Sequence, residues 1–287
     1  MNKWIVGARV RTLPAAIVPV AVGATVAVGE PAVTWWRVVL AGVVSLMLQV
    51  GVNYANDYSD GVRGTDDMRV GPARLVGGGL ATARAVRRAA FMSFLVAAVA
   101  GLVLALQTSL WLVVIGLASI LAGWFYTGGR HPYGYLGFGE LFVFVFFGLV
   151  ATVGTTYVVA ERVTALAWQM GVSVGALACA LLVTNNLRDI PTDRAVGKRT
   201  LAVRLGDPRT RRLYVGLVVG GVVIGAAAAW QRPLAALSLV VLLAALSPVR
   251  AVRRGASGRE LIAVLAGTAR VQMVFGVVAS LTLAVGA

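Results

Sequence analysis

Apolar runs long enough to cross a lipid bilayer recur along the whole of this 287-residue chain. A helix needs about 20 apolar residues to cross a hydrocarbon core of roughly 30 Å. The candidate segments are 13–29, 37–55, 85–106, 109–127, 138–159, 165–185, 212–230, 234–250 and 260–285. Charged residues make up 13% of the chain, about half their share in soluble domains. We therefore expect an all-α, polytopic membrane protein, with about nine transmembrane helices bundled in a single domain over residues 1–287.

The basic residues indicate how these helices are oriented. If the N-terminus lies in the cytoplasm, twenty-two of the 26 Lys and Arg residues fall in cytoplasmic loops, and Arg37, Arg162 and Arg232 fall on the other side. Arg270 lies inside the last segment. This bias is typical of the positive-inside rule, and it accounts for most of the +15 net charge. The arginines are scattered over loops without interleaved aromatic residues, which argues against nucleic-acid binding and leaves anionic lipids or an anionic substrate as partners.

The aspartates gather in two windows that resemble each other. All seven are Asp57, Asp60, Asp66 and Asp67 in the first window, and Asp189, Asp193 and Asp207 in the second. At 100° per residue, Asn53, Asp57 and Asp60 share one helix face within roughly 60°. In the second window Asn185 again precedes acids, Asp189 and Asp193, at i+4 and i+8, although Pro191 is expected to bend or end that helix near Asp189.

Both windows are expected on the cytoplasmic side, in the acidic motif segments 53–84 and 185–212. Their helices, the second and sixth spans, are four crossings apart, so both windows return to the same membrane face. This placement predicts two pseudo-repeated four-helix units with a site at their interface. Carboxylates of this kind suit Mg²⁺, which takes one or two protein carboxylates and completes its shell with water and phosphate. Nearby arginines and lysines suit the phosphate oxygens of a diphosphate.

The alternative for these acids is that they are only solvated helix caps. A lone acidic pair would be a cap more often than not, but a cap does not explain why aspartate is missing from every other loop, or why the asparagine recurs at the same offset. The remaining metal-binding residue types are sparse. His131 and Cys179 are the only histidine and cysteine, so a histidine-based zinc site and an internal disulfide are excluded.

Several motifs together resemble those of the UbiA superfamily of intramembrane prenyltransferases. They are NDYSDGVRGTD at 56–66, RVGP at 69–72, NNLRD at 185–189 and GKRTLAVRLG at 197–206, with RTLP at 11–14, YTGG at 126–129 and GFGE at 137–140. Within the superfamily, the resemblance is greatest to the menaquinone branch. It departs from the wider pattern at Gly64, where relatives often carry an acid that Asp66 could replace, and in the glycine-rich stretch 76–79.

The resemblance implies an enzyme of a bacterial plasma membrane with its active site facing the cytoplasm. The enzyme would use Mg²⁺ to transfer a polyprenyl group from polyprenyl diphosphate to 1,4-dihydroxy-2-naphthoate, whose carboxylate is lost, giving demethylmenaquinone. The predicted metal ligands are Asp57, Asp60, Asp66, Asp189 and Asp193, and all but Asp66 are also predicted to be catalytic, together with Lys198. The predicted substrate-binding residues are Asn53, Asn56, Asn185, Arg63, Tyr126, Arg130, Arg188, Lys198, Arg199 and Arg11.

Three other functions are compatible with parts of the pattern. Within the superfamily, 4-hydroxybenzoate is the alternative acceptor. A secondary transporter would also combine repeats with acidic residues, but it predicts carboxylates deep within the spans, whereas these lie at the helix ends. A phosphatidyl-alcohol transferase would carry one compact acidic motif on a smaller bundle, not two windows about 130 residues apart.

Overall fold

The computed structural model describes residues 2–65 and 74–287, and in these ranges it contains helices and loops without any strand. Asp66 and Asp67 lie outside the described residues. The elements are α1 (Lys3–Ala8), η1 (Val10–Thr12), α2 (Pro14–Val26), α3 (Trp36–Arg63), α4 (Ala83–Gln107), α5 (Trp111–Phe125), η2 (Tyr133–Leu136), α6 (Gly139–Val143), the π-helix η3 (Phe144–Val150), α7 (Ala151–Ala160), α8 (Ala165–Ala195), α9 (Leu201–Leu205), α10 (Asp207–Ala226), η4 (Ala227–Trp230), η5 (Pro233–Val240), α11 (Val241–Arg253) and α12 (Glu260–Val285). The prediction of an all-α membrane protein is confirmed.

Every predicted segment is helical, but the number of full-length spans is smaller than nine. Among the described residues, seven helices are long and apolar enough to cross a membrane, and α1 with η1 and α2 forms an eighth if this pair, bent by 53°, counts as one span. The segment predicted at 109–127 corresponds to α5, which has only 15 residues. The predicted segment 13–29 corresponds to α2, which begins at Pro14, and the bend separates it from α1 and η1 before it.

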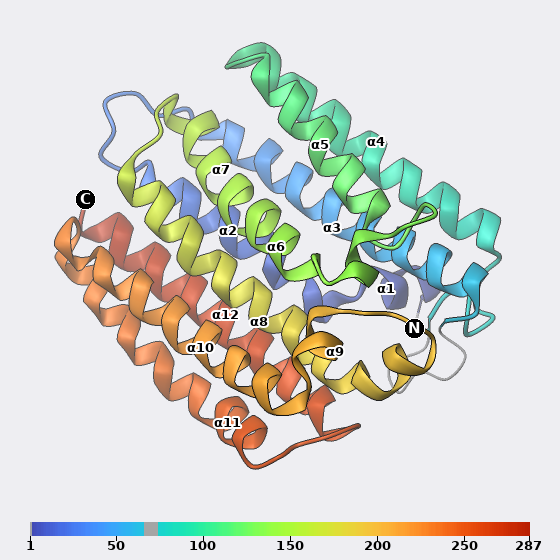
Figure 1. Cartoon of the computed structure of the whole chain (residues 1–287). Coiled ribbons are helices and arrows are strands. Elements are labelled where there is room, and N and C mark those ends of the chain that lie inside the picture. The colour runs from blue at the N-terminus through green and yellow to red at the C-terminus, as the bar shows by residue number, and fades with distance from the viewer. Residues whose placement is uncertain (1, 66–73) are drawn as a thin grey trace.

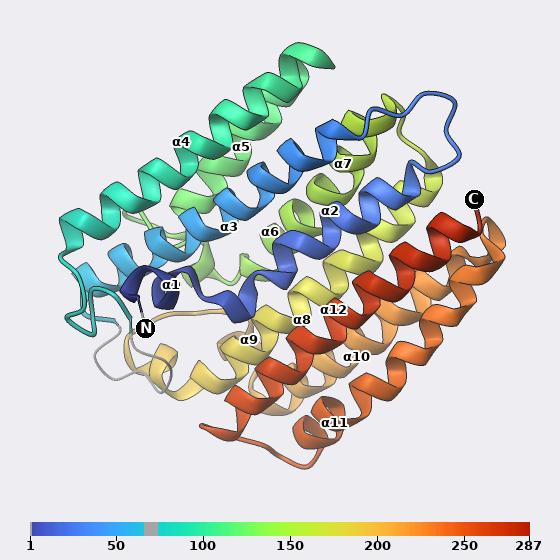
Figure 2. The ribbon, with the colours of Figure 1, turned by 180° about the vertical axis from the view of Figure 1, so that it is seen from behind.

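The helices lie side by side, and α8 lies at their centre (Figures 1 and 2). In α8, 78% of the most apolar stretch is buried, compared with 33–50% in the other six long helices. Contacts are most extensive between α3 and α4 and between α8 and α10. These are the equivalent pairs of the two predicted four-helix units, because each joins an acid-bearing helix to the next span. The C-terminal ends of α3 and α8 lie at the same end of the bundle, near α1 and α9 (Figure 1).

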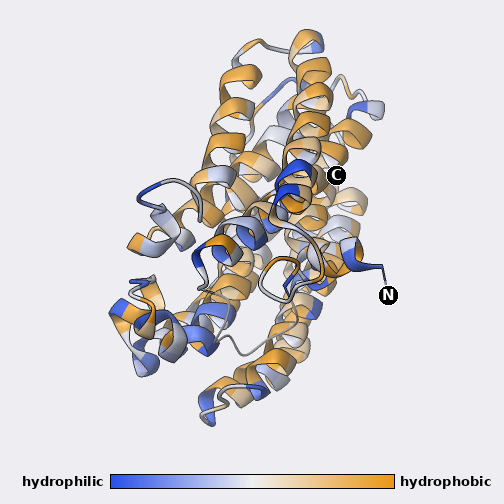
Figure 3. Cartoon of the chain, turned by 90° about the vertical axis from the view of Figure 1, so that its right-hand side faces the viewer, coloured by the Kyte–Doolittle hydropathy of each residue, from blue (hydrophilic) through white to orange (hydrophobic). Residues whose placement is uncertain are grey.

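The surface of the bundle has the polarity that a membrane requires. Figure 3 shows hydrophobic residues along the helix shafts and hydrophilic residues mainly in the loops and helix ends. On α4 and α5 the outward side chains include Phe91, Leu95, Leu106 and Trp111, each at least half exposed. In a soluble protein such a surface would cause aggregation. Here it is the face that contacts lipid.

The second acidic window is held on one continuous helix. Pro191 was expected to bend or end the helix near Asp189, but α8 continues past it to Ala195. Pro191 lies within the last two turns, so the hydrogen bond that it lacks and the clash of its ring with the preceding turn affect only the end of α8. Asp189 and Asp193 therefore remain one turn apart on α8. In the first window α3 ends at Gly64, which adopts a left-handed conformation with φ of 69°, as is common for glycine after a helix.

The π-helix η3 packs closely against α8 through two glycines. A Cβ atom added to Gly148 would lie 2.5 Å from the Cα of Gly175 and 2.8 Å from the carbonyl oxygen of Gly171. Both neighbours are backbone atoms, which cannot move without shifting a helix. Small residues at such contacts let membrane helices approach closely.

Gly148→Ala is therefore expected to destabilise the fold by about 1–3 kcal/mol, the usual range for overpacking. The melting temperature of the detergent-purified variant measures this effect. Gly220→Ala on α10 is the matched control, because an added Cβ there meets no atom within 4 Å. Equal melting temperatures for the two variants would contradict the close contact between η3 and α8.

Candidate active site

A single cavity of about 790 Å³ receives the ends of both acidic helices. Its polar end is lined by Asn53, Asn56 and Asp60 from α3, by Asn185, Asn186, Asp189 and Asp193 from α8, and by Lys198. Away from this end the lining becomes apolar and includes Leu112, Ile115 and Val158. The cavity therefore combines a charged end with a larger apolar part. Such a space suits a molecule with an anionic head and a hydrocarbon tail.

Asp57 lies in the wall behind the cavity and holds two arginines. Its carboxylate is 1% exposed; Oδ1 accepts hydrogen bonds from Arg9 and from Arg74, the latter at 2.8 Å, and Oδ2 accepts one from the Leu75 backbone N–H at 3.1 Å. Arg9 and Arg74 line the cavity, whereas Asp57 does not. In this structure Asp57 positions two cations at the polar end. Its predicted role as a direct metal ligand stays a prediction.

Asp60 connects α3 to the loop that follows α8. Its Oδ1 accepts hydrogen bonds from the Tyr135 hydroxyl and from Lys198 Nζ, the latter at 3.3 Å. Lys198 Nζ also lies 4.4 Å from the centre of the Tyr135 ring, within cation–π range. Burial alone would lower the pKa of Lys198, but the negative charges of Asp60 and Asp193, together with the contact with Tyr135, outweigh it, so the pKa of Lys198 is raised. Lys198 therefore stays protonated at neutral pH.

Lys198→Gln is expected to raise KM for an anionic diphosphate substrate about 10- to 100-fold, the effect of losing one charge-assisted hydrogen bond of about 1.5–3 kcal/mol. Because the pKa of Lys198 is raised, its charge persists below its ordinary pKa of about 10.4 and is lost only as pH rises through the higher value. Steady-state kinetics should thus show no fall in diphosphate affinity from Lys198 between pH 7 and 9. Arg194→Gln, at an exposed position, is the control. An unchanged KM in Lys198→Gln would contradict the assignment.

On the α8 side, Asp189 forms a bidentate pair with its neighbour Arg188. Arg188 Nε and Nη2 donate to Asp189 Oδ1 and Oδ2 at 2.6 and 2.8 Å, and both residues are buried. Asp189 lines the cavity but Arg188 does not, so the predicted phosphate contact of Arg188 is replaced here by contact with the carboxylate. Asp193, one turn further along, also lines the cavity.

The three asparagines predicted to bind substrate form different hydrogen bonds in the structure. Asn53 Nδ2 donates to the Ala8 carbonyl at 2.9 Å, which fixes α1 against α3. Asn56 Oδ1 accepts from the Thr127 hydroxyl at 2.8 Å. Asn185 lines the cavity, and its Nδ2 donates only within α8, at 3.5 Å to the Leu181 carbonyl. Asn53 and Asn56 thus shape the site through neighbouring segments, while Asn185 faces its interior.

Besides Arg188, four more predicted substrate-binding arginines do not line the cavity. Arg63 donates to the carbonyls of Thr127 and Gly129, which anchors the loop after α5. The side chains of Arg11, Arg130 and Arg199 are exposed and lie outside the lining. Sequence spacing could not separate these arginines from Arg9 and Arg74, because all of them lie in basic loops at the same end of the bundle. Tyr126, by contrast, lines the cavity, and its contact with the substrate stays a prediction.

The acidic residues fit a metal that is shared with a substrate. Within residues 2–65 and 74–287, no three acidic, histidine or cysteine side chains lie close enough to hold a metal ion by themselves. Asp60, Asp189 and Asp193 nevertheless face one cavity from two helices. Mg²⁺ usually takes one or two carboxylates and completes its shell with water and substrate phosphates. The donor set is thus suited to magnesium that enters together with a diphosphate. Asp66, predicted as a further ligand, lies outside the described residues.

Comparison with known proteins places this arrangement in a family. The model of the UbiA prenyltransferase family matches residues 16–268, which include both acidic windows. This chain belongs to the UbiA prenyltransferase family. The resemblance inferred from the motifs is thereby confirmed, and the transporter and phosphatidyl-alcohol transferase alternatives are wrong.

Two UbiA relatives match most of the chain. The 1,4-dihydroxy-2-naphthoate octaprenyltransferase of Mycobacterium tuberculosis is 51% identical over 284 residues, which cover 99% of this chain and 97% of the relative. The protein of the same name from Escherichia coli is 36% identical over 236 residues, covering 77% of this chain and 74% of the relative. Among solved structures, a UbiA homolog from Archaeoglobus fulgidus bound to GPP and Mg²⁺ has a TM-score of 0.73 at 13% identity, covering 98% of this chain and 99% of its own. This last likeness shows that the fold is shared.

Arg9 and Arg74 are the charged residues lining the cavity of this UbiA family member that the sequence did not single out. Arg9 follows α1 in a left-handed conformation with φ of 53°, which is uncommon for residues other than glycine and often marks functional sites. That backbone conformation and the pairing with Asp57 are invisible in the sequence. A stronger signal was available for Gln49, which lines the cavity and lies four residues before Asn53, on the same face of α3.

Proposed function

We propose that this protein transfers a polyprenyl group from a polyprenyl diphosphate to 1,4-dihydroxy-2-naphthoate, with loss of the acceptor carboxylate, to give demethylmenaquinone. The observation that carries the proposal is 51% identity, over 99% of the chain, to a relative named 1,4-dihydroxy-2-naphthoate octaprenyltransferase. The cavity supports it, because a charged end and a larger apolar part match the head and tail of a prenyl diphosphate.

The residues at the polar end fit the first half of this reaction. When the allylic carbon–oxygen bond breaks, negative charge grows on the departing diphosphate. Lys198, Arg9 and Arg74 line the cavity where that charge develops, and preorganised cations there stabilise the transition state more than the ground state. Asp60, Asp189 and Asp193 would hold Mg²⁺, which supplies further positive charge to the leaving group when bound.

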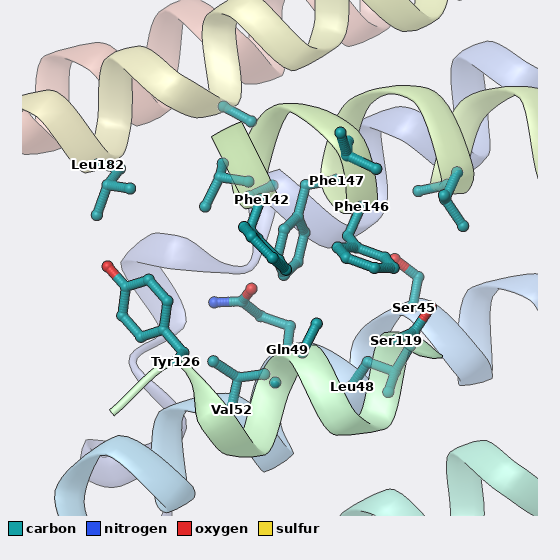
Figure 4. Close-up of a pocket in the computed structure, with 18 of the residues that line it drawn as sticks. Ser45, Leu48, Gln49, Val52, Ser119, Tyr126, Phe142, Phe146, Phe147 and Leu182 are labelled. Atoms are coloured by element: carbon teal, nitrogen blue, oxygen red, sulfur yellow. The ribbon is translucent and has the colours of Figure 1, made fainter. Parts of the chain in front are cut away.

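The apolar part of the cavity fits the second half. The allylic carbon becomes cationic and must meet an electron-rich ring before it meets water, so the space around it must be dry. Tyr126, Phe142 and Phe147 line this region (Figure 4). Tyr133 is also part of the cavity lining. The faces of these rings carry partial negative charge and can stabilise a passing cation, while their bulk excludes water.

We also propose that the N-terminus and the polar end of the cavity face the cytoplasm of a bacterial cell. The support is the twenty-two to three distribution of basic residues in the loops. Cysteine variants in the loops, labelled from either side of sealed vesicles with a membrane-impermeant maleimide, test this orientation. Labelling at Arg162→Cys from the cytoplasmic side would contradict it.

The reaction itself is tested by product analysis. Purified protein is incubated with Mg²⁺, a polyprenyl diphosphate, and either 1,4-dihydroxy-2-naphthoate or 4-hydroxybenzoate, and the products are identified by mass. We expect a prenylated, decarboxylated product from the naphthoate and none without Mg²⁺. Prenylation of 4-hydroxybenzoate alone would overturn the proposed acceptor but not the family.

A further inference from the structure

Two amide side chains, one from each acidic helix, line the cavity in addition to its charged residues. Gln49 lies on α3 one turn before Asn53, and Asn186 lies on α8 three residues before Asp189. Neither belongs to the metal or diphosphate machinery described above. Each can present either an N–H donor or a carbonyl oxygen, so the chemistry they recognise depends on which way each amide is turned.

The hydrogen bonds of Thr12 determine how Gln49 is turned. The Thr12 hydroxyl donates its one hydrogen to the Arg9 carbonyl at 2.9 Å. It can therefore only accept from Gln49 Nε2, at 3.0 Å, and from Asn53 Nδ2, at 3.2 Å. Gln49 Oε1 is left without a partner among the described residues. Figure 4 shows the Gln49 amide projecting into the space bounded by Tyr126, Phe142 and Phe147.

Glu140 determines the orientation of the Asn186 amide in the same way as Thr12 does for Gln49. Asn186 Nδ2 donates to Glu140 Oε1 at 2.9 Å, because a carboxylate oxygen can only accept from it. Glu140 is 8% exposed, and its other oxygen is buried without a hydrogen-bond partner among the described residues. An ionisable side chain placed there, in the first turn of a membrane span, is expensive and needs a function. The consequence is that Asn186, like Gln49, has its carbonyl oxygen to offer to the cavity.

Flat aromatic side chains form part of the same cavity lining. Tyr133 stacks on Phe142 with ring centres 3.9 Å apart, and Phe142 stacks on Phe146 at 6.0 Å. Tyr126 meets the edge of Tyr133 at 5.5 Å. The wide π-helical turn of η3 brings Phe146 and Phe147 onto the lining together, and such turns are frequent at functional sites. Side chains of this kind favour a planar aromatic ligand.

We infer that Gln49 and Asn186 each accept a hydrogen bond from a hydroxyl group of the aromatic acceptor, so that the cavity selects a dihydroxylated ring. This inference rests on the proposed function and names the groups that set its acceptor specificity. Carbonyl oxygens accept hydrogen bonds only, so they recognise ring hydroxyls and not an ionised carboxylate. A site built to hydrogen-bond a hydroxyl rejects analogues that lack it. Glu140 is a positioning residue that acts through Asn186.

Acceptor binding, measured apart from turnover, tests the inference. Isothermal titration of the protein, with Mg²⁺ and an unreactive prenyl diphosphate analogue, compares 1,4-dihydroxy-2-naphthoate with 1-hydroxy-2-naphthoate and 4-hydroxy-2-naphthoate. Kinetics alone would not serve, because removing a hydroxyl also makes the ring less nucleophilic. In the wild type we expect each missing hydroxyl to weaken binding about tenfold, the effect of one hydrogen bond of about 1.4 kcal/mol. Equal affinity for all three ligands overturns the inference without any variant.

Variants then assign each oxygen to a hydroxyl. Gln49→Met keeps the length of the side chain. In this variant we expect one monohydroxy analogue to bind as tightly as 1,4-dihydroxy-2-naphthoate does. In Asn186→Leu we expect the same for the other analogue. Ser45→Ala is the matched control, because Ser45 lines the cavity but its hydroxyl donates to the Ala16 carbonyl at 2.8 Å; it should keep both tenfold penalties. Penalties that persist unchanged in Gln49→Met and Asn186→Leu contradict the assignment.

The role of Glu140 has a readout of its own. Glu140→Leu should lose the same hydroxyl selectivity as Asn186→Leu, whereas Glu140→Gln keeps an acceptor oxygen for Asn186 Nδ2 and should restore it. A merely structural Glu140 would lower affinity for all three ligands alike. The product assay separates the two levels of inference. If the wild type prenylates dihydroxynaphthoate but binds the monohydroxy analogues equally well, the hydroxyl contacts are wrong and the proposed function stands.

Discussion

Asp60→Asn is expected to lower kcat/KM for prenyl transfer about 1,000-fold while leaving the protein folded. Asparagine keeps the shape of the side chain and can still accept the Tyr135 hydroxyl, but it removes the charge that faces the cavity beside Lys198. Losing one preorganised charge partner of a transition state typically costs 100- to 1,000-fold, and here both the metal and Lys198 are affected. Steady-state kinetics and the melting temperature of the same preparation measure the two effects.

Asp207→Asn is the matched control for this change. Asp207 belongs to the second aspartate window but pairs with Arg211 at 2.6 Å outside the cavity lining and is half exposed. The same substitution there should leave kcat/KM within about twofold of the wild type, because exposed pairs of this kind contribute little. Comparable activity in Asp60→Asn and Asp207→Asn would show that Asp60 has no part in the reaction.

Asp57→Asn is expected to act on stability as well as on activity, which distinguishes it from Asp60→Asn. The Asp57 carboxylate is 1% exposed and forms ion pairs with both Arg9 and Arg74. Breaking a buried pair typically costs 3–5 kcal/mol. We expect about 3 kcal/mol, the lower end, because the Arg9 side chain keeps 23% of its exposure and remains partly hydrated.

Thermal unfolding in detergent, followed by circular dichroism, checks this expectation, with Gly220→Ala as a packing-neutral comparison. A normal melting temperature combined with lost activity would contradict the positioning role of Asp57 and favour direct contact with the metal. A variant that melts normally and remains fully active would contradict both roles.

The fold was predictable because a bilayer imposes strong rules on sequence. Long apolar runs specified which segments are helical, and the repeated asparagine–aspartate spacing predicted that the ends of α3 and α8 meet. The rules are weaker where tertiary contacts replace lipid. The bend before Pro14, the short α5 and the π-helix η3 depend on how helices pack against each other. The hydropathy of the sequence alone does not predict this packing.

The site was predictable in residue type but less so in role. The sequence identified the carboxylates and the need for positively charged side chains. It assigned substrate binding to Arg130, Arg199 and Arg11, however, and these lie outside the cavity lining. The cations that line the cavity besides Lys198 are Arg9 and Arg74, and Asp57 holds both. Which arginine turns inward depends on a left-handed residue at the end of α1 and on the loop after α3. Periodicity along a helix does not encode either feature.

The central claim is that α3 and α8 bind one magnesium diphosphate between them. Isothermal titration with an unreactive polyprenyl diphosphate analogue tests it in the wild type, in Asp60→Asn from α3 and in Asp193→Asn from α8. We predict one site per chain that requires Mg²⁺, with affinity weakened at least about 100-fold by either substitution. Affinity that depends on only one of the two helices, or that is unchanged when Mg²⁺ is chelated, would contradict the claim.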